Sequence, residues 1–478
     1  MHSKTILIFI GLAFACILNP ILCLESITLE IFLKQLKANH PYVTQQLLEH
    51  DINDAKRSAT KGSQDWLFNA SASYLDSEPM SVGFQQINSL KNNTFKTHLN
   101  KQFWLTGGTL SLGVESNLFK EIKRTTLARQ FMTQPLENYT ESKTFVSYTQ
   151  PLFQNLGGRL FRFPYEQASL QTKLRNLESN ENIERFLTNM SKAFIDWRHS
   201  HHQKNNAQTR LSLAKQSYQQ SMRRFKANVV EKLDVLRASA ALNLAKQNLL
   251  LAESNLIATT KELSLSANIP ELQMLKPELD VYQTKKINKK ATLLLLKQTR
   301  FIKQFDIQEQ LLKKTKAFYL EKKKPNVSLS LYASLSSYDE NLAYSFLLNY
   351  NDYQASLTYA VPLGETETTH MIQSFKLQEL QLKKSKNKSL LALEGSKEAL
   401  LTQINYLEKI ISLNKKQVSL AQQVTQEELR LYNQGRTTIF QVIEAQDQEQ
   451  QTKLNYLTNA KNYQHLVLEF NNLFDLIY

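Results

Sequence analysis

Three histidines and one aspartate in the middle of the chain are residue types that bind metal ions. Asp196, His199 and His202 have a spacing that places them roughly on one face of a helix, with His201 beside them. A structural zinc site needs four ligands, and no fourth ligand is identifiable in the sequence around them. The spacing therefore favours a polar helix face, and we expect neither a metal nor a cofactor.

The common motifs of catalysis do not occur in the sequence. It contains no glycine-rich phosphate loop, no nucleophile elbow and no pair of carboxylates in a glycine-bounded turn. The sequence therefore gives no support to an enzyme.

Two stretches of sixteen residues are more informative. Residues 223–238 (RRFKANVVEKLDVLRA) and 430–445 (RLYNQGRTTIFQVIEA) align without a gap at an offset of 207 residues. Each stretch interrupts a very long region with almost no Gly or Pro, so we interpret each as the tip of a helical hairpin. Three columns are identical in the two stretches, namely Arg223/Arg430, Val235/Val442 and Ala238/Ala445.

The composition predicts long uninterrupted elements. Only 11 Gly and 10 Pro occur in 478 residues. The formal charge of +15 permits contact with anionic surfaces, but Lys and Arg are scattered along the helical regions. This scatter favours solvated helix faces over nucleic-acid binding, so nucleic acid is not an expected partner.

Residues 1–23 have the pattern of a secretory signal peptide, because Lys4 precedes an apolar run that ends before Pro20. Both cysteines, Cys16 and Cys23, lie in this segment, so cleavage after residue 23 would leave a chain without cysteine. Cys16 follows Phe14-Ala15 and Cys23 follows Leu22, so neither has the run of small residues that lipidation requires, and a lipid anchor is not favoured. No later stretch approaches the roughly 20 apolar residues of a membrane helix, so any membrane span would be built from strands.

Periodicity predicts the elements that position the two tips. Thr28 is a candidate N-cap, and Pro41 a break, in the first helical stretch. Helices are expected over residues 27–58, from Pro164 to the first tip, and over 233–266, 284–323, 376–431 and 439–476. Strands are expected over residues 66–74, twice within 95–118 around a turn at 106–108, and over 144–153, 326–337 and 344–363, with 120–142 as a loop.

The order of these elements repeats, which indicates a tandem duplication. Residues 148–152 (YTQPL) and 359–363 (YAVPL) match at an offset of 211, close to the 207 of the tips. We therefore divide the chain into a signal peptide (1–23), a first repeat (24–270) and a second repeat (271–478).

Two amphipathic patterns indicate how these elements could pack. Before the second tip, seven residues, all but Asn414 apolar, recur at spacings of three and four, which is the pattern of a coiled-coil seam; they are Leu400, Ile404, Leu407, Ile411, Asn414, Val418 and Ala421. Residues 326–359 are rich in tyrosine, which fits either an ordinary sheet core or a membrane girdle. The signal peptide and the polar second face favour the girdle, and a few strands can close a barrel only if several chains combine.

The chain resembles the TolC family of outer-membrane efflux proteins over essentially its whole mature length. The resemblance rests on the opening Ile27-Thr28-Leu29-Glu30 helix, on the strand ends at Pro151-Leu152 and Pro362-Leu363, and above all on the tips. Residues 430–435 (RLYNQG) and 442–446 (VIEAQ) resemble the family's tip motif, as do residues 233–236 (LDVL) in the first half.

The resemblance implies a mainly α fold with β strands. Tandem-duplicated long hairpins would form a periplasmic α-barrel in a homotrimer, and each chain would give four strands to a shared 12-stranded outer-membrane β-barrel. Those strands would be residues 66–76, 144–153, 326–337 and 353–362, with the hairpin at 95–118 as an extracellular extension. The implied location is the outer membrane of a Gram-negative-type envelope, with a large periplasmic portion.

The resemblance also implies a periplasmic gate between the tips. Asp234 and Tyr432 fall on a gate pair of the family, Thr437 on the position of its gate arginine, and Gln441 and Glu444 on its lumen-facing aspartate pair. Three copies of Glu444 would give three carboxylates where some relatives have six. Two alternatives remain open: Asp234 could simply favour the first turn of its helix, and Tyr432 could continue the coiled-coil seam.

Two functions of different class follow. The first is a passive exit duct for efflux or type I secretion, working with a periplasmic adaptor, an inner-membrane pump and outer-membrane lipid. The second is a non-conducting periplasmic coiled-coil adaptor or structural protein. Adaptors normally have one helical hairpin, whereas two are predicted here, which favours the duct.

Overall fold

The computed structural model describes residues 26–78, 87–124, 138–284 and 296–477. The expected signal peptide, both cysteines and the centre of the expected 120–142 loop lie outside these residues. The chain forms two compact units. The hairpin unit contains the described residues of Met1–Thr44, Ile183–Leu293 and Glu394–Tyr478, and the sheet unit contains those of Gln45–Asn182 and Leu294–Leu393.

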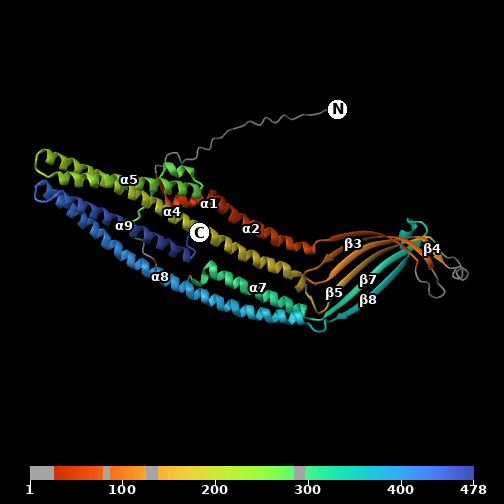
Figure 1. Ribbon diagram of the computed structural model, residues 1–478. Helices are drawn as coiled ribbons and strands as arrows, with labels where there is room; N and C mark the ends of the chain where they lie inside the picture. The colour runs from red at the N-terminus through yellow and green to blue at the C-terminus, as the bar shows by residue number, and fades with distance from the viewer. Residues whose placement is uncertain (1–25, 79–86, 125–137, 285–295, 478) are drawn as a thin grey trace, which may run out of the picture. The chain divides into compact units, whose positions relative to one another are not determined.

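Two long helical hairpins dominate the fold (Figure 1). Helix α4 (Arg159–Lys226) is followed by α5 (Lys232–Ala267), and α8 (Thr366–Asn433) is followed by α9 (Ile439–Leu473). Helices α4 and α8 have 68 residues each, whereas α5 has 36 and α9 has 35, so the two halves repeat one pair of lengths. The sequence prediction of two long hairpins is confirmed. None of the described helices combines the length and the apolar character needed to cross a membrane.

Side chains between the helices hold the hairpin unit together. The predicted seam of α8 is half-buried or buried along its length, and Asn459 of α9 donates to Asn414 at 2.8 Å. Helix α4 is joined to α9 by the pair Arg210–Asp447, with 2.6 Å between nitrogen and oxygen. The Arg210 side chain is 7% exposed and also donates to Gln446 at 2.7 Å, so this contact lies inside the helix pair.

A second core forms where the start of the chain meets α4 and α5. Strand β1 (Ser26–Thr28) pairs in parallel with β6 (Lys276–Glu278), after the 3-10 helix η3 (Pro270–Met274). Helix α1 (Leu29–Asn39) begins at its predicted N-cap, because Thr28 Oγ1 accepts from the Ile31 amide at 3.3 Å. Phe32 and Leu36 of α1 are buried against Phe194.

The sheet unit contains one antiparallel sheet of six strands in the order β2-β3-β4-β5-β7-β8. The strands are β2 (Leu67–Ser77), β3 (Ile87–Gln102), β4 (Thr109–Arg124), β5 (Tyr139–Pro151), β7 (Asn326–Asp339) and β8 (Tyr350–Ala360). The unit also contains most of α2 (Pro41–Ala59), α7 (Arg300–Lys322) and the 3-10 helices η2 (Thr60–Gln64), η4 (Leu296–Gln298) and η5 (Tyr344–Leu347).

Three expectations for this unit are corrected. The hairpin expected as an extension is β3 and β4, which lie inside the sheet between β2 and β5. The expected loop over 120–142 is wrong at both ends, because β4 continues to Arg124 and β5 begins at Tyr139. The last strand begins only at Tyr350, since residues 344–347 form η5. The ends of β4 and β5 contain polar residues because one face of the sheet is polar. Their sequence therefore resembles that of a loop.

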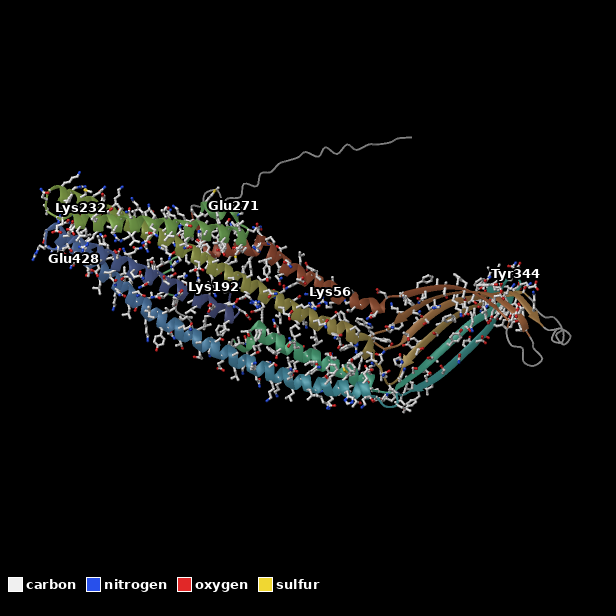
Figure 2. All side chains as sticks on the ribbon, in the orientation of Figure 1. Lys56, Lys192, Lys232, Glu271, Tyr344 and Glu428 are labelled. Carbon is white, nitrogen blue, oxygen red and sulfur yellow. The ribbon has the colours of Figure 1, made fainter. Side chains whose placement is uncertain are left out.

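The two faces of the sheet differ in chemistry, as the cross-strand register establishes. One, the apolar face, includes Phe68, Tyr74, Phe95, Leu99, Leu112, Val146, Leu331, Leu335, Tyr353 and Leu357. The other, the polar face, includes Asn69, Ser73, Lys96, Asn100, Glu115, Ser147, Ser330, Asp352 and Ser356. Many apolar-face side chains are exposed, with Tyr353 at 79% and Phe68 at 62%. Figure 2 shows the side chains along the sheet, with Tyr344 labelled at one of its ends.

Phe194 tests the core of the hairpin unit, because its ring is fully buried 5.1 Å from Phe32 and 5.6 Å from Trp197. Phe194→Ala should destabilise this unit by about 3–5 kcal/mol, since it removes apolar contacts and leaves a cavity. Thermal unfolding followed by the helical circular-dichroism signal should show a marked fall in midpoint. Leu265→Ala is the matched control, because Leu265 is 79% exposed, and an equal fall in both variants would contradict this packing.

Candidate functional site at the helical tips

The turns of the two hairpins share one backbone structure. Asn228 and Gly435, which are equivalent at the offset of 207, both have positive φ values, 57° and 74°. The amide of Asn228 bonds the carbonyl of Phe225 at 2.9 Å, and that of Gly435 bonds the carbonyl of Tyr432 at 3.0 Å. A left-handed residue after the last turn is a common way to end a helix, and glycine or asparagine adopts it with least strain.

The two tips lie side by side, as Figure 1 shows and a shared apolar cluster establishes. Ala238 of α5 is buried with Tyr432 of α8 and with Ile439 and Val442 of α9. Lys232 and Glu428, labelled in Figure 2, mark the two turns. The tips therefore form one packed assembly within a single chain.

Tyr432 is the central side chain of this assembly. It is 1% exposed, and its hydroxyl lies 3.2 Å from Ser221 Oγ of α4. The Arg224 guanidinium lies over its ring at 4.3 Å, and Arg224 also donates to the carbonyl of Asn433 at 2.8 Å. Tyr432 thus joins the end of α4 to the end of α8 through packing, a hydrogen bond and a cation–π contact.

The expected pair of Asp234 and Tyr432 is not brought together by a hydrogen bond within one chain. Asp234 is half-buried in the first turn of α5, and Glu444 is exposed on α9. Among the described residues, neither carboxylate has a hydrogen-bond or ion-pair partner.

Thr437 and Gln441 form a small polar group at the second turn. Thr437 Oγ1 lies 3.1 Å from Glu428 Oε2 and 3.3 Å from Gln441 Oε1. Thr438 Oγ1 donates to the same Gln441 oxygen at 3.0 Å. These contacts fix the turn before α9 within its own hairpin.

Ser221 and Arg224 are not among the residues predicted from the sequence. Ser221 lies just before the compared stretch, and the repeat pairs Arg224 with the apolar Leu431. The available signal was the helical spacing, since residues three or four apart share one face of α4. That spacing does not say which helix the face contacts.

A conservative change at Tyr432 separates the stabilising contribution of its hydroxyl group from that of its ring packing. Tyr432→Phe should cost about 1 kcal/mol, because it removes one hydrogen bond and keeps the ring under Arg224. Tyr432→Ala should cost about 3–5 kcal/mol through the cavity it leaves. Limited proteolysis at the tips measures the difference, and the Phe variant should stay close to the parent chain. Equal sensitivity of the two variants would contradict this account.

The histidine group on α4 lies beside Asp196, which contacts α9. In the described part of the chain, no group of three or more His, Cys, Asp or Glu residues is placed to hold a metal ion. Asp196 Oδ1 instead lies 3.3 Å from Lys461 Nζ and 3.4 Å from His465 Nε2 of α9. Burial raises the pKa of Asp196, but these two contacts outweigh it, so the pKa is lowered. Burial, assisted by the charge of Lys461, lowers the pKa of His199 to about 4.

Acidification should destabilise the hairpin unit through His199. The folded chain keeps this imidazole neutral down to about pH 4, whereas an unfolded histidine binds a proton near 6.5. Between these values the unfolded chain holds more protons, so stability falls as the pH falls. The unfolding midpoint should drop between pH 7.5 and 5, and His199→Gln should drop less. His370→Gln, at an exposed position, is the control, and equal slopes for all three chains would contradict this origin.

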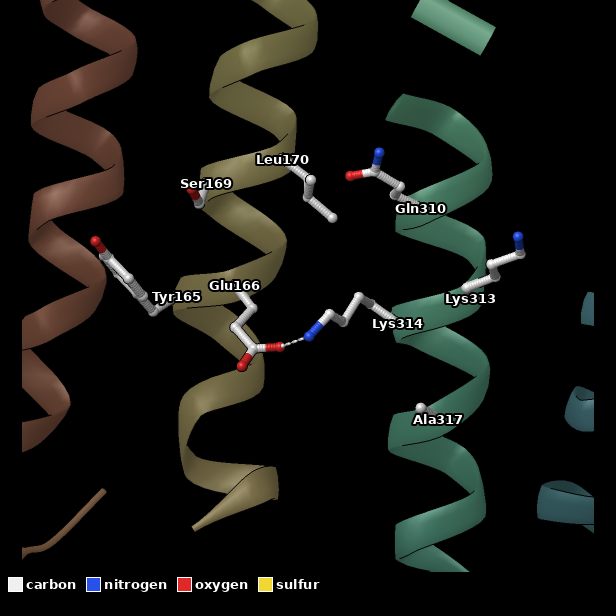
Figure 3. A pocket seen from close by; sticks show the side chains of 8 residues that line it. All are labelled: Tyr165, Glu166, Ser169, Leu170, Gln310, Lys313, Lys314 and Ala317. Atoms are coloured by element: carbon white, nitrogen blue, oxygen red, sulfur yellow. Dashed lines mark hydrogen bonds and ion pairs between the residues drawn. The ribbon is translucent and has the colours of Figure 1, made fainter. Parts of the chain in front are cut away.

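The sheet unit contains a separate open groove between α4 and α7 (Figure 3). Its volume is about 570 Å³, and Glu166 of α4 and Lys314 of α7 meet across it at 2.8 Å. Lys313 extends away from this ion pair (Figure 3). The groove has no cluster of groups that would do chemistry.

Comparison with known proteins identifies the fold. No protein-family model matches the sequence, and no curated protein matches it. Solved structures do match, at 11–12% identity. The outer-membrane protein VceC of Vibrio cholerae has a TM-score of 0.66 over 94% of this chain and 96% of its own. The chain has the fold of outer-membrane channels.

Two further channels support this assignment. The Campylobacter jejuni CmeC outer-membrane channel gives a TM-score of 0.66 over 94% of this chain and 86% of its own. The open state of the Neisseria gonorrhoeae MtrE outer-membrane channel gives 0.67 over 94% and 88%. The fold predicted from the tip motifs is therefore confirmed, although identity is only 12%.

Proposed function

We propose that this chain is a passive outer-membrane exit channel, assembled as a homotrimer and closed at its helical tips. The observation that carries the proposal is the likeness of fold to outer-membrane channels over 94% of the chain. Two features of the chain itself, described next, support it.

The first feature is apolar surface on the hairpin unit that a single chain leaves uncovered. Leu244 and Leu251 of α5 are 52% and 62% exposed, and Leu413 and Leu420 of α8 are 62% and 61% exposed. Apolar residues at helical spacing on an exposed face indicate contact with a partner. These two helix faces would be buried between neighbouring copies, and the packed helices would form the wall of the channel.

The second feature is the exposed apolar face of the sheet. Exposed tyrosine, phenylalanine and leucine side chains on one face suit contact with lipid, and the Ser- and Asn-rich polar face suits water. This arrangement supports a location in the outer membrane, with the hairpins in the periplasm.

The gate would be formed by the tips of neighbouring copies. Asp234 and Glu444 have no partner in the described chain, so their carboxylates can accept charge-assisted hydrogen bonds from another copy. Tyr432, Thr437 and Gln441 hold each tip in shape through their contacts with Ser221, Glu428 and Thr438. Three copies of Glu444 would place a modest negative charge at the narrow end.

A passive channel needs an energy source elsewhere in the envelope. We propose an inner-membrane pump joined to the tips by a periplasmic adaptor protein, in drug efflux or in type I secretion. An adaptor hairpin would dock between neighbouring tips and break the contacts between copies.

Conductance in planar lipid bilayers tests the proposal. The purified wild-type assembly should conduct weakly, because its tips are closed. Asp234→Ala should raise single-channel conductance several-fold by removing a contact between copies. Glu262→Ala is the control, since Glu262 is an exposed acid of the same helix far from the tips, and it should leave the conductance unchanged.

The same recording separates the channel from a non-conducting coiled-coil adaptor. No current from wild type or from Asp234→Ala, with protein shown to be inserted in the bilayer, would overturn the channel function. An equal rise in Asp234→Ala and Glu262→Ala would leave the channel but reject the gate role of Asp234.

A further inference from the structure

The sheet contains two more strands per chain than the resemblance implies. Strands β3 and β4 have 16 residues each and are among the longest of the six. They are paired on both sides: β3 pairs with β2 from Leu67 to Ser77, and β4 pairs with β5 from Thr109 to Phe119. A hairpin that projected from the end of the sheet would leave β2 and β5 in contact, which they are not.

The inserted hairpin has the same two faces as the rest of the sheet. Phe95, Leu99 and Leu112 lie on the apolar face, and Phe95 is 54% exposed. On the polar face, Lys96 Nζ lies 2.7 Å from Glu115 Oε1, and Thr94 donates to Asn117 at 2.8 Å. An extension surrounded by water would have no reason to separate apolar from charged side chains in this way.

The two edge strands fit each other as neighbours. Strands β2 and β8 have 11 residues each, enough to cross a bilayer when tilted. All six strands alternate in direction, so β8 of one copy would meet β2 of the next in antiparallel orientation. The middle residues of the two strands, Ala72 and Ala355, both lie on the apolar face, so the faces also match.

We propose that β3 and β4 are membrane-spanning wall strands, and that three copies close a barrel of roughly 18 strands, with β8 of each copy paired to β2 of the next. This inference rests on the proposed trimeric channel. Barrel diameter grows roughly linearly with strand number, so the lumen would be about one and a half times as wide as that of a 12-stranded barrel. The outer exit would then accept bulkier cargo, and the tips would remain the narrowest point.

Cysteine labelling of the full-length assembly in lipid vesicles tests whether β3 crosses the membrane. Asn100→Cys, on the polar face, should react with a membrane-impermeant maleimide. Leu99→Cys, on the apolar face, should be at least tenfold slower until detergent is added. Ser330→Cys and Leu331→Cys on β7 form the matched pair, and the wild-type chain gives the background.

The two β7 variants distinguish a failure of this inference from a failure of the proposed channel. Protection of Leu331→Cys together with fast labelling of both β3 variants would place β3 outside the membrane and overturn this inference alone. Fast labelling of both β7 variants would show that the sheet is not embedded in the membrane. That result would overturn both the proposed channel and this inference.

Cross-linking tests the closure between copies. The double variant Ala72→Cys/Ala355→Cys, treated with a bis-maleimide about 10 Å long, should give covalent dimers and trimers on a denaturing gel. A shift of two residues in register moves the partner by about 7 Å and stays within reach. Each single variant should remain monomeric on the gel. A double variant that stays monomeric, in vesicles where Leu99→Cys is protected, would overturn the pairing of β8 with β2.

Discussion

Every backbone N–H and C=O group in a sheet needs a partner, and the rest of this structure depends on that constraint. In one chain the six strands satisfy each other, but β2 and β8 remain as edges. Lipid offers no hydrogen bonds, so a sheet inserted in a bilayer must close on itself. Under the proposed function, other copies would complete this sheet, which has one exposed apolar face and two open edges.

The helical hairpins meet the same requirement by different means. A helix satisfies its own backbone, so its packing depends on side chains alone. Within the chain, the seam of α8 packs on α9, and Arg210, Asp447 and Gln446 join α9 to α4. The apolar residues left over on α5 and α8 are more than half exposed, which again points to neighbouring copies.

The tips combine side-chain contacts that hold their shape with two carboxylates that have no side-chain partner among the described residues. Tyr432 is buried under Arg224 and beside Ser221, so it belongs to the internal structure of the tip. Asp234, which is half-buried, and Glu444, which is exposed, have no side-chain partner among the described residues. A gate between copies needs this division, because contacts between copies can break while each tip keeps its shape.

The sequence by itself determined the two hairpins, their tips within residues 223–238 and 430–445, and the N-cap at Thr28, because helical periodicity and capping are local signals. It also pointed to the channel fold through the order and spacing of the tip motifs. Only the tertiary structure decided that β3 and β4 lie inside the sheet, and that Tyr432 contacts Ser221 within the chain. The order of the strands and the choice of which helices pack together depend on contacts between residues far apart in the chain. A local pattern of residue types does not choose among the possible partners.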